Sequence, residues 1–484
     1  MDSVKEKAIS GFLWRVIQNG GAQIISFIVS IILARLLSPE DYGLIAMITV
    51  FTNIALVFIN VGFSSSIVQK KELNELDINT MFYSGIILAT VIYLILFLCA
   101  PLISSFYAEP SLTILLRVES LIVIIGSLYS VQQALLIRRL EFKKSCLASI
   151  LGVITQGLVG ISLAYLGFGV WAIVFSTLSN YFVCAIILWV IVDWKPAFQF
   201  SFLSLNKVLG FSSKMLFSEL LNSIFNNIRS IIIGKQYSSA DLAYYNKGYQ
   251  FPTLIMTQID GAMTTVLFSS LSSIQDDWRE KGLPALRRAM KMSLYICSPI
   301  LLGLFAVAEP LVLLLLTEKW ANSIIYVRLC CIICLFWPLS AQRHALNARG
   351  QSGVTLKLNI ISKIITLLLL LATYKHSVEL LVSSTIIASL ICLIIGMITY
   401  KKYLDYPLIL QIIDIAPPIL LSVVMSFGVW CVSLLKLSNL VTLVMQVIVG
   451  FILYILLSWI FRVDSFFYLL DMVKGLLSRK RNCT

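Results

Sequence analysis

Apolar runs of about 20 residues recur along the whole chain, and a short polar loop separates each run from the next. A run of this length spans the hydrocarbon core of a bilayer when it forms a helix. Hydrophobic residues make up 59% of the 484 residues and charged residues 13%, which leaves too little polar surface to cover a water-soluble fold. The sequence therefore predicts an all-α polytopic membrane protein with about 14 transmembrane helices.

The expected spans follow from the lengths of these runs and the positions of the polar loops. They are 12–34, 44–66, 80–104, 114–136, 146–166, 169–192, 210–233, 249–271, 289–308, 322–342, 354–374, 377–399, 412–434 and 439–461. An even number of spans places both termini on the same side of the membrane. The segment after the last span mixes apolar and basic residues, which predicts an amphipathic helix at the membrane surface.

Lysine and arginine are distributed unequally between the two sides of this topology. Of the 37 basic residues, 27 fall on the side that holds both termini, 6 on the opposite side and 4 within spans. Cytoplasmic loops of multi-pass membrane proteins retain positive charge. Both termini are therefore predicted to be cytoplasmic. The net charge of +13 then faces anionic lipid headgroups, and no nucleic-acid partner is expected.

The sequence contains an internal duplication that begins with the first and seventh spans. A shift of 200 residues brings the polar set Asn19, Ala22, Gln23, Ser26 and Ser30 onto Glu219, Asn222, Ser223, Asn226 and Ser230. This spacing places each set along one face of a helix. Ser38 and Asp41 likewise fall on Ser238 and Asp241, and a shift of 210 residues brings Gln132 onto Gln342. Two separate helices therefore carry the same polar stripe.

A repeat of six spans predicts the domain organisation. Because six is an even number, the two copies run parallel and are related by an axis along the membrane normal. We expect an N-terminal six-helix lobe (1–195), a C-terminal six-helix lobe (196–402), two additional transmembrane helices (403–462) and a cytoplasmic amphipathic tail (463–484). In transporters of this kind the substrate path lies between the lobes, and the two polar stripes are expected to face it.

Three stretches of the chain resemble a known family, and they occur in the expected order. Residues 34–43 (Ala-Arg-Leu-Leu-Ser-Pro-Glu-Asp-Tyr-Gly) follow the first span, residues 244–250 (Tyr-Tyr-Asn-Lys-Gly-Tyr-Gln) enter the eighth, and residues 346–350 (Leu-Asn-Ala-Arg-Gly) leave the tenth. Together with the arrangement of spans, they resemble the polysaccharide transporter branch of the multidrug/oligosaccharidyl-lipid/polysaccharide (MOP) exporter superfamily. The resemblance covers essentially the whole chain.

This resemblance implies a Wzx-type flippase of the bacterial cytoplasmic (inner) membrane. Such a protein translocates, by alternating access, an oligosaccharide that is linked through diphosphate to a polyisoprenoid carrier of the undecaprenyl type. The cargo serves the biosynthesis of lipopolysaccharide, capsule or exopolysaccharide. The implied partners are this lipid-linked oligosaccharide, membrane lipids and polysaccharide polymerase machinery, and no cofactor is expected.

A diphosphate headgroup calls for cationic side chains along its path. Arginine supplies a permanently charged, forked donor for phosphate oxygens. The basic residues within or at the edges of spans are Arg15, Arg117, Arg229, Arg328 and Lys214. We expect Arg15 and Lys214 near the cytoplasmic mouth and the other three towards the outer side. The competing interpretation is that cations near helix ends extend to the membrane interface.

A glycan calls for side chains that both donate and accept hydrogen bonds. Amides within the predicted spans have this property. The candidates are Asn19, Gln23, Asn53, Asn222 and Asn226. Each amide alone is also compatible with a hydrogen bond between neighbouring helices, so the prediction of a hydrophilic cavity depends on the two matching stripes.

Three carboxylates lie at or near membrane depth, where proton or cation coupling is the usual functional interpretation. They are Glu219, Glu119 and Asp260. The alternative is an internal ion pair, such as Glu219 with Arg15. A phosphate-binding loop for ATP is absent from the sequence, so the driving force remains open between the membrane potential, an ion gradient and consumption of the product.

Two other functions are compatible with an apolar, duplicated chain. A small-molecule or cation exporter of the same superfamily would need acidic and aromatic groups, and the membrane arginines argue against it. A non-transporting membrane scaffold of a polysaccharide assembly machine would leave the polar stripes without a role. We predict no enzymatic activity, because His344 and His376 lack a catalytic partner set. The ten cysteines lie mostly in apolar runs, which predicts packing and no metal site.

Overall fold

The structure is a computed structural model of the 484-residue chain. It describes the backbone of residues 2–62, 64–70, 72–272 and 277–481. Within these ranges the side chains at 2–13, 15–17, 19, 61, 62, 65, 69, 207–212, 214, 260–272, 472, 473 and 475–481 are not described. Four of the candidate residues, Arg15, Asn19, Lys214 and Asp260, therefore lie outside the described residues.

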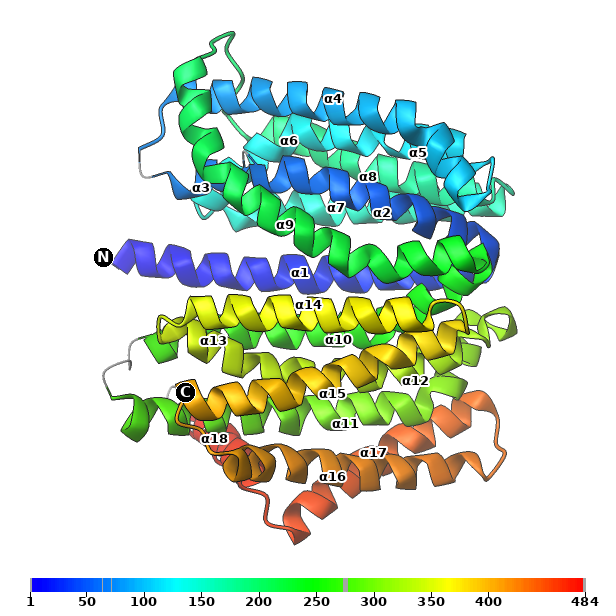
Figure 1. Cartoon of the computed structure of the whole chain (residues 1–484), viewed down its shortest axis with the longest axis vertical. Coiled ribbons are helices and arrows are strands. Elements are labelled where there is room, and N and C mark those ends of the chain that lie inside the picture. Colours follow the sequence, from blue (N-terminus) through cyan, green and yellow to red (C-terminus); the bar gives the residue numbers. More distant parts are fainter. Residues whose placement is uncertain (1, 63, 71, 273–276, 482–484) are drawn as a thin grey trace. The chain divides into compact units, whose positions relative to one another are not determined.

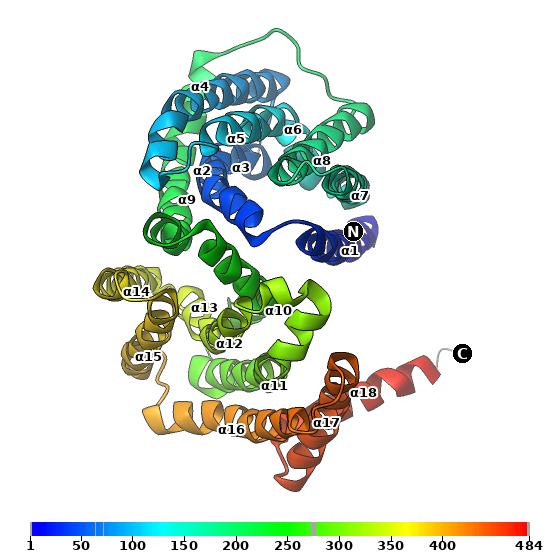
Figure 2. The same cartoon turned by 90° about the vertical axis from the view of Figure 1, so that its right-hand side faces the viewer.

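The described chain is built from helices and contains no strand (Figures 1 and 2). It divides into two compact units, Met1–Ala243 and Tyr244–Thr484. The first unit holds α1 (Asp2–Leu36), α2 (Pro39–Gly62), α3 (Ser64–Gln69), α4 (Glu75–Tyr107), α5 (Leu112–Glu119), α6 (Leu121–Arg138), α7 (Phe142–Tyr165), α8 (Val170–Ile191), α9 (Phe202–Gln236) and the start of α10 (Ser239–Ser272).

The second unit continues with the rest of α10. It also holds the π-helical turn η1 (Trp278–Gly282), α11 (Leu283–Leu316), the 3-10 turn η2 (Glu318–Trp320), α12 (Ser323–Cys334), the 3-10 turn η3 (Trp337–Ser340), α13 (Ala341–Ala348), α14 (Ser352–Thr373), α15 (Val378–Tyr403), α16 (Leu408–Ser433), α17 (Asn439–Ile460) and α18 (Asp464–Arg481). The last helix agrees in place with the predicted amphipathic tail.

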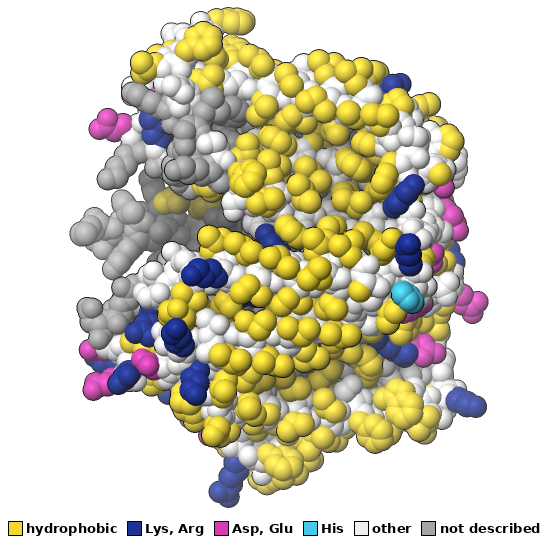
Figure 3. All heavy atoms as spheres, in the orientation of Figure 1, with side chains coloured by type: hydrophobic (Ala, Val, Ile, Leu, Met, Phe, Trp, Pro, Cys, Tyr) yellow, Lys and Arg dark blue, Asp and Glu magenta, His cyan; other side chains and the backbone are white. Residues whose placement is uncertain are grey.

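Eleven helical stretches of the described residues are long and apolar enough to cross a membrane. They coincide with eleven of the predicted spans. The other three predicted spans coincide with α1, α9 and α10, which are 35, 35 and 34 residues long. Figure 3 shows hydrophobic side chains over the middle of the helices and charged side chains mainly near their ends. The chain is therefore an all-α multi-pass membrane protein.

The internal duplication is visible in the local structure where the second helix of each repeat begins. The Ser38 hydroxyl donates to Asp41 Oδ2 at 3.1 Å, and the Asp41 N–H donates to Ser38 Oγ at 3.2 Å. The Ser238 hydroxyl donates to Asp241 Oδ2 at 2.7 Å, and the Asp241 N–H donates to Ser238 Oγ at 3.1 Å. Both helices therefore begin with the same reciprocal cap, 200 residues apart.

The structure breaks two helices that the sequence predicts as continuous spans. The span expected at 114–136 is divided between α5 and α6 at Ser120, whose hydroxyl donates to the Arg117 carbonyl at 3.1 Å. Such back-bonding by serine bends helices. The span expected at 322–342 is divided between α12 and α13, where Pro338 lies in the turn η3. Proline lacks an N–H and disfavours helical geometry in the residue before it.

The boundary between the compact units differs from the predicted boundary between the lobes, because of where α9 packs. This helix packs on α2 and α4 within the first unit, so the boundary of the compact units lies between Ala243 and Tyr244. The sequence duplication instead predicts a lobe boundary at 195/196. That assignment of residues 196–243 stays a prediction. In the second unit, α16 and α17 lie side by side and pack on α11 (Figure 2).

Candidate functional site

A polar cavity of about 350 Å³ lies in the first unit among α2, α3 and α6. Its polar lining residues are Asn60, Ser64, Tyr129, Ser130 and Gln133. All five side chains carry hydroxyl or amide groups, which both donate and accept hydrogen bonds. Val68, Ala134 and Ile137 complete the lining, so the cavity combines neutral hydrogen-bonding groups with an apolar wall.

One wall of this region is held by a network of amides and hydroxyls. Gln18 Nε2 donates to Ser145 Oγ at 3.0 Å and to Ser149 Oγ at 2.8 Å, which joins α1 to α7. Gln133 Nε2 donates to the same Ser145 Oγ at 2.7 Å, which joins α6 to α7. The Ser145 hydroxyl in turn is placed to donate to Gln18 Oε1, at 3.3 Å. Ser145 therefore uses its full hydrogen-bonding capacity.

The structure places the described amide candidates on three helices of the first unit. Gln23 on α1 and Asn222 on α9 are half-buried, whereas Asn53 on α2 and Asn226 on α9 are exposed. Asn222 Nδ2 donates to Glu219 Oε2 at 3.4 Å, as expected for two residues on one helical face. The polar stripe of α9 therefore exists as predicted, but whether it binds a glycan remains a prediction.

The described cationic candidates do not form one cluster through their contacts. The Arg117 guanidinium lies 4.2 Å from the centre of the Phe97 ring, and its Nε donates to the Phe97 carbonyl at 3.2 Å. Arg229 is half-buried on α9 in the first unit. In the second unit, Arg328 Nη2 lies 3.4 Å from Glu309 Oε2. Because Arg117 and Arg328 have partners within their own units, a ladder of phosphate-binding arginines stays a prediction.

Glu119 is the more buried of the two described carboxylate candidates, with 3% of its surface exposed. It is the last residue of α5, directly before the break at Ser120. Its Oε2 has no hydrogen-bond partner among the described residues. Glu219 is exposed on α9 and contacts Asn222. A buried carboxyl group at a helix break is compatible with a coupling role. That role of Glu119 stays a prediction.

The strongest charge cluster lies in the second unit, at residues that the sequence interpretation had not assigned to a site. The Asp414 side chain is fully buried on α16. Arg287 of α11 binds it through two hydrogen bonds, Nε to Oδ2 at 2.6 Å and Nη2 to Oδ1 at 2.9 Å. Lys291 Nζ lies 3.0 Å from Oδ1, and the Tyr406 hydroxyl donates to Oδ2 at 2.5 Å. The cluster therefore joins α11 to the additional helix α16.

Tyr406 lies in the loop between α15 and α16, outside the apolar spans. Burial, together with the Asp414 carboxylate beside it, raises the pKa of the Tyr406 hydroxyl above its ordinary value. The phenol therefore keeps its proton over the whole physiological range and remains a donor to Asp414. One signal in the sequence pointed to this cluster, because Asp414 is a carboxylate inside the span expected at 412–434.

The three stretches that carry the family resemblance have structural roles. A Cβ on Gly43 would lie 1.9 Å from the Ser239 carbonyl oxygen, and a Cβ on Gly248 would lie 2.8 Å from the Val327 nitrogen. Gly350 has a φ of 73° after α13, a conformation that favours glycine. Arg349 Nη1 donates to the Tyr403 carbonyl at 2.6 Å, at the end of α15. These motifs encode close packing and helix ends, so they identify the fold better than the cargo.

Metal binding and cysteine chemistry find little support in the described part of the chain. No group of three or more His, Cys, Asp or Glu residues there is arranged to hold a metal ion. Cys330, Cys331 and Cys334 are buried on α12 as free thiols. Their position fits the packing role that the sequence predicts.

The comparison with known sequences gives one family over most of the chain. Residues 32–325 match the family described as polysaccharide biosynthesis protein. The succinoglycan biosynthesis transport protein ExoT of Rhizobium meliloti (strain 1021) is 27% identical over 314 residues, which cover 64% of this chain and 63% of ExoT. The lipopolysaccharide biosynthesis protein WzxC of Escherichia coli (strain K12) is 24% identical, covering 74% of this chain and 73% of WzxC. The matched region thus spans just under two thirds of ExoT.

Solved structures show the same fold at low sequence identity. The lipid II flippase MurJ in an inward closed conformation has a TM-score of 0.74 and 15% identity, covering 94% of this chain and 99% of that one. An inward-facing multidrug resistance MATE family transporter of the MOP superfamily has a TM-score of 0.62 and 17% identity, covering 80% of this chain and 95% of that one. The chain belongs to the polysaccharide biosynthesis protein family and has the fold of MOP superfamily transporters.

Proposed function

We propose that this protein is a flippase that translocates a polyisoprenyl-diphosphate-linked oligosaccharide across the bacterial cytoplasmic membrane, for the biosynthesis of a cell-surface polysaccharide. The observation that carries the proposal is the neutral polar cavity of the first unit, lined by Asn60, Ser130 and Gln133 within a membrane-spanning bundle. Family membership and the names of ExoT and WzxC support it.

The physical requirement of this task explains why such a cavity is needed. Sugar hydroxyls and phosphates cannot cross hydrocarbon unaided, because each unpaired polar group costs several kcal/mol to desolvate. Amides and hydroxyls replace water around a glycan without selecting a single sugar. Basic side chains such as Arg15 and Arg229 then attract the diphosphate. The protein opens this path to one side of the membrane at a time, and it catalyses no covalent step.

The polyisoprenoid part of the cargo needs an apolar surface. A groove of about 830 Å³ in the second unit is lined mainly by aliphatic and aromatic side chains of α11, α16, α17 and α18. Pro299, Gly303 and Gly450 are among its lining residues and keep part of the groove free of long side chains. Such a surface fits a hydrocarbon chain.

The orientation follows from the distribution of charge. The 27 basic residues on one side support a cytoplasmic position for both termini. An inside-negative potential then favours outward movement of an anionic headgroup by about 2.3 kcal/mol per charge per 100 mV. A reporter fused to the C-terminus that is active only in the cytoplasm tests this orientation.

The decisive experiment is a flipping assay in sealed proteoliposomes with a fluorescent diphosphate-linked glycolipid. Wild type, Arg15→Ala and Arg229→Ala are compared at equal reconstitution, with Arg279→Ala as the matched control, because Arg279 is 80% exposed and pairs only loosely with Asp405. We expect loss of transfer in at least one of the first two variants and none in the control. A wild type that transfers no glycolipid but exports organic cations would replace this proposal with the cation exporter.

A second comparison tests the polar cavity itself. Asn60 is exposed and lines the cavity, so Asn60→Leu removes hydrogen-bonding capacity with little effect on packing. Asn439→Leu is the control, because Asn439 is also exposed and begins α17 in the second unit. We expect slower transfer of long glycans in the first variant only. Equal rates in both variants would remove the cavity from the glycan path.

A further inference from the structure

Two adjoining cavities lie in the second unit. One has a volume of about 560 Å³ and the other about 340 Å³. They share the lining residues Lys291, Asp464 and Ser465, so they form one continuous recess. We call this recess, between α11, α16, α17 and the start of α18, the α11–α16 recess.

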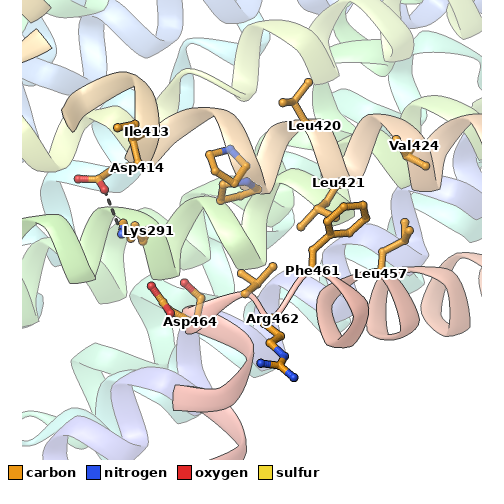
Figure 4. A pocket seen from close by; sticks show the side chains of 14 residues that line it. Lys291, Ile413, Asp414, Leu420, Leu421, Val424, Leu457, Phe461, Arg462 and Asp464 are labelled. Carbon is orange, nitrogen blue, oxygen red and sulfur yellow. Dashed lines mark ion pairs between the residues drawn. The ribbon is translucent and has the colours of Figure 1, made fainter. Parts of the chain in front are cut away.

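The larger part of the α11–α16 recess is apolar. Figure 4 shows Leu420, Val424 and Phe461 along it, from α16 and from the end of α17. Their side chains remain 62%, 56% and 67% exposed, although they belong to a membrane-spanning bundle. Large exposed aliphatic surface in such a bundle faces hydrocarbon. This wall is therefore suited to a lipid chain.

The smaller part of the recess is basic. Arg287, Arg288 and Lys291 line it from successive positions of α11, and Arg462 lines the larger part from the loop after α17. Two carboxylates, Asp414 and Asp464, also line the recess. Four cations against two carboxylates leave an excess of two positive charges. Asp414 is fully buried between Arg287 and Lys291, so that group keeps one positive charge, and Asp464 alone opposes Arg288 and Arg462. Part of the excess therefore lies on the side of the recess that Arg288 and Lys291 line.

A basic site beside an apolar wall fits one class of ligand. Basic pockets between transmembrane helices on the cytoplasmic side bind anionic lipid headgroups. Arginine and lysine bind phosphate oxygens by charge-assisted hydrogen bonds. The same cavity places the acyl chain against α16 and α17. A soluble phosphate would leave the apolar wall unused.

We propose that the α11–α16 recess binds an anionic glycerophospholipid of the inner leaflet, with its phosphate against Arg288 and Lys291 and an acyl chain along Leu420 and Val424. The lipid joins α11 of the second repeat to the two additional helices, next to the Asp414 cluster. Its binding site shares no residue with the groups proposed to bind the glycan or its diphosphate, so the proposal does not depend on flipping activity.

The test measures lipid binding to the purified full-length protein in a neutral detergent. Phosphatidylglycerol is compared with phosphatidylcholine of the same acyl chains, and glycerol phosphate serves as the soluble headgroup; native mass spectrometry reports the bound species. We expect phosphatidylglycerol to bind about tenfold more tightly than phosphatidylcholine, because Arg288 and Lys291 attract an anionic headgroup. Glycerol phosphate is expected to bind far more weakly than the intact lipid.

Matched variants locate the site. Arg288→Gln with Lys291→Gln is expected to weaken phosphatidylglycerol binding about tenfold, whereas Lys401→Gln with Lys402→Gln, which removes two exposed cations of α15, is expected to change it little. Lys291→Arg should retain binding. Equal affinity for both phospholipids, or unchanged phosphatidylglycerol binding in the first double variant, would overturn the proposal.

Two further variants test the site independently, in case the double variant does not fold. Lys291→Gln alone leaves Asp414 bound to Arg287 and Tyr406, so the helix contact survives. Val424→Trp fills the apolar wall at an exposed position without changing any charge. Both are expected to weaken phosphatidylglycerol binding. Retention of full binding in both would exclude this recess as the lipid site, and tight binding of glycerol phosphate would show an anion site in place of a lipid site.

Discussion

Two polar clusters, one in each unit, are built from different groups. In the first unit, Gln18, Gln133 and Ser145 form a neutral network in which every bond is an amide or hydroxyl hydrogen bond. In the second unit, the buried Asp414 is held by two cations and a phenol. A neutral hydrogen bond contributes about 1 kcal/mol net, whereas breaking a buried ion pair costs about 3 to 5 kcal/mol. Neutral groups are therefore easier to exchange for cargo.

This difference shows that a duplicated sequence need not duplicate its polar chemistry. At the shift of 209 residues that aligns Pro101 of α4 with Pro310 of α11, Arg287 and Lys291 fall on the apolar residues Ile78 and Phe82. Only the second repeat has two further membrane helices to hold, and its α11 carries the cations that bind α16.

The largest expected effect comes from removing the centre of the ionic cluster. Asp414→Ala leaves Arg287 and Lys291 without their carboxylate, and we expect a loss of about 2 to 4 kcal/mol of stability, somewhat reduced because both cations are partly exposed. Thermal unfolding in detergent measures it. Arg279→Ala is the control, since its pair with Asp405 is largely exposed, and it should have little effect. Equal melting temperatures for both variants would mean that the cluster does not hold α16.

The signature glycines should be intolerant of a methyl group in both units. Gly43→Ala and Gly248→Ala would press a Cβ against backbone atoms, and we expect each to cost about 1 to 3 kcal/mol in the same unfolding assay. Gly303→Ala is the matched control, because its nearest neighbour is Met425 Cε at 3.6 Å, an ordinary contact. A Gly248→Ala protein as stable as wild type would show that the close approach of α10 and α12 relaxes easily.

The neutral network should be less sensitive than the ionic cluster. Ser145→Ala removes the acceptor of Gln18 and Gln133, so we expect a loss of about 1 to 2 kcal/mol. Ser179→Ala, whose hydroxyl bonds only to the Ser176 carbonyl of its own helix, should change stability little. If Ser145→Ala costs as much as Asp414→Ala, the contrast between the two units fails.

The smallest expected losses of stability come from removing the cap that α2 and α10 share. Ser38→Ala and Ser238→Ala remove the same cap from α2 and α10, and each should cost about 1 kcal/mol. Hydrogen exchange at the first turns of the two helices resolves these losses separately. A loss of protection at only one helix would show that the repeated cap contributes differently to stability in the two copies.

Much of the fold was predictable because apolar runs, basic loops and repeated caps are local features. The helices lie where these patterns place them, and the caps of α2 and α10 are alike. The breaks at Ser120 and η3 were missed, because an apolar run looks the same whether its helix is continuous or bent. The polar stripe of α9 was also predictable from spacing, since Glu219 and Asn222 do contact each other.

The chain's own sequence determined that it spans a membrane many times, how its helices follow one another and to which family it belongs, because hydrophobic length and short motifs act locally. Only the tertiary structure decided which distant polar residues meet. Gln18 and Ser145 are separated by 127 residues, and so are Arg287 and Asp414. Which residues become partners depends on how one helix packs on another. Helical periodicity shows which residues share a face of a helix, but not which neighbouring helix that face contacts.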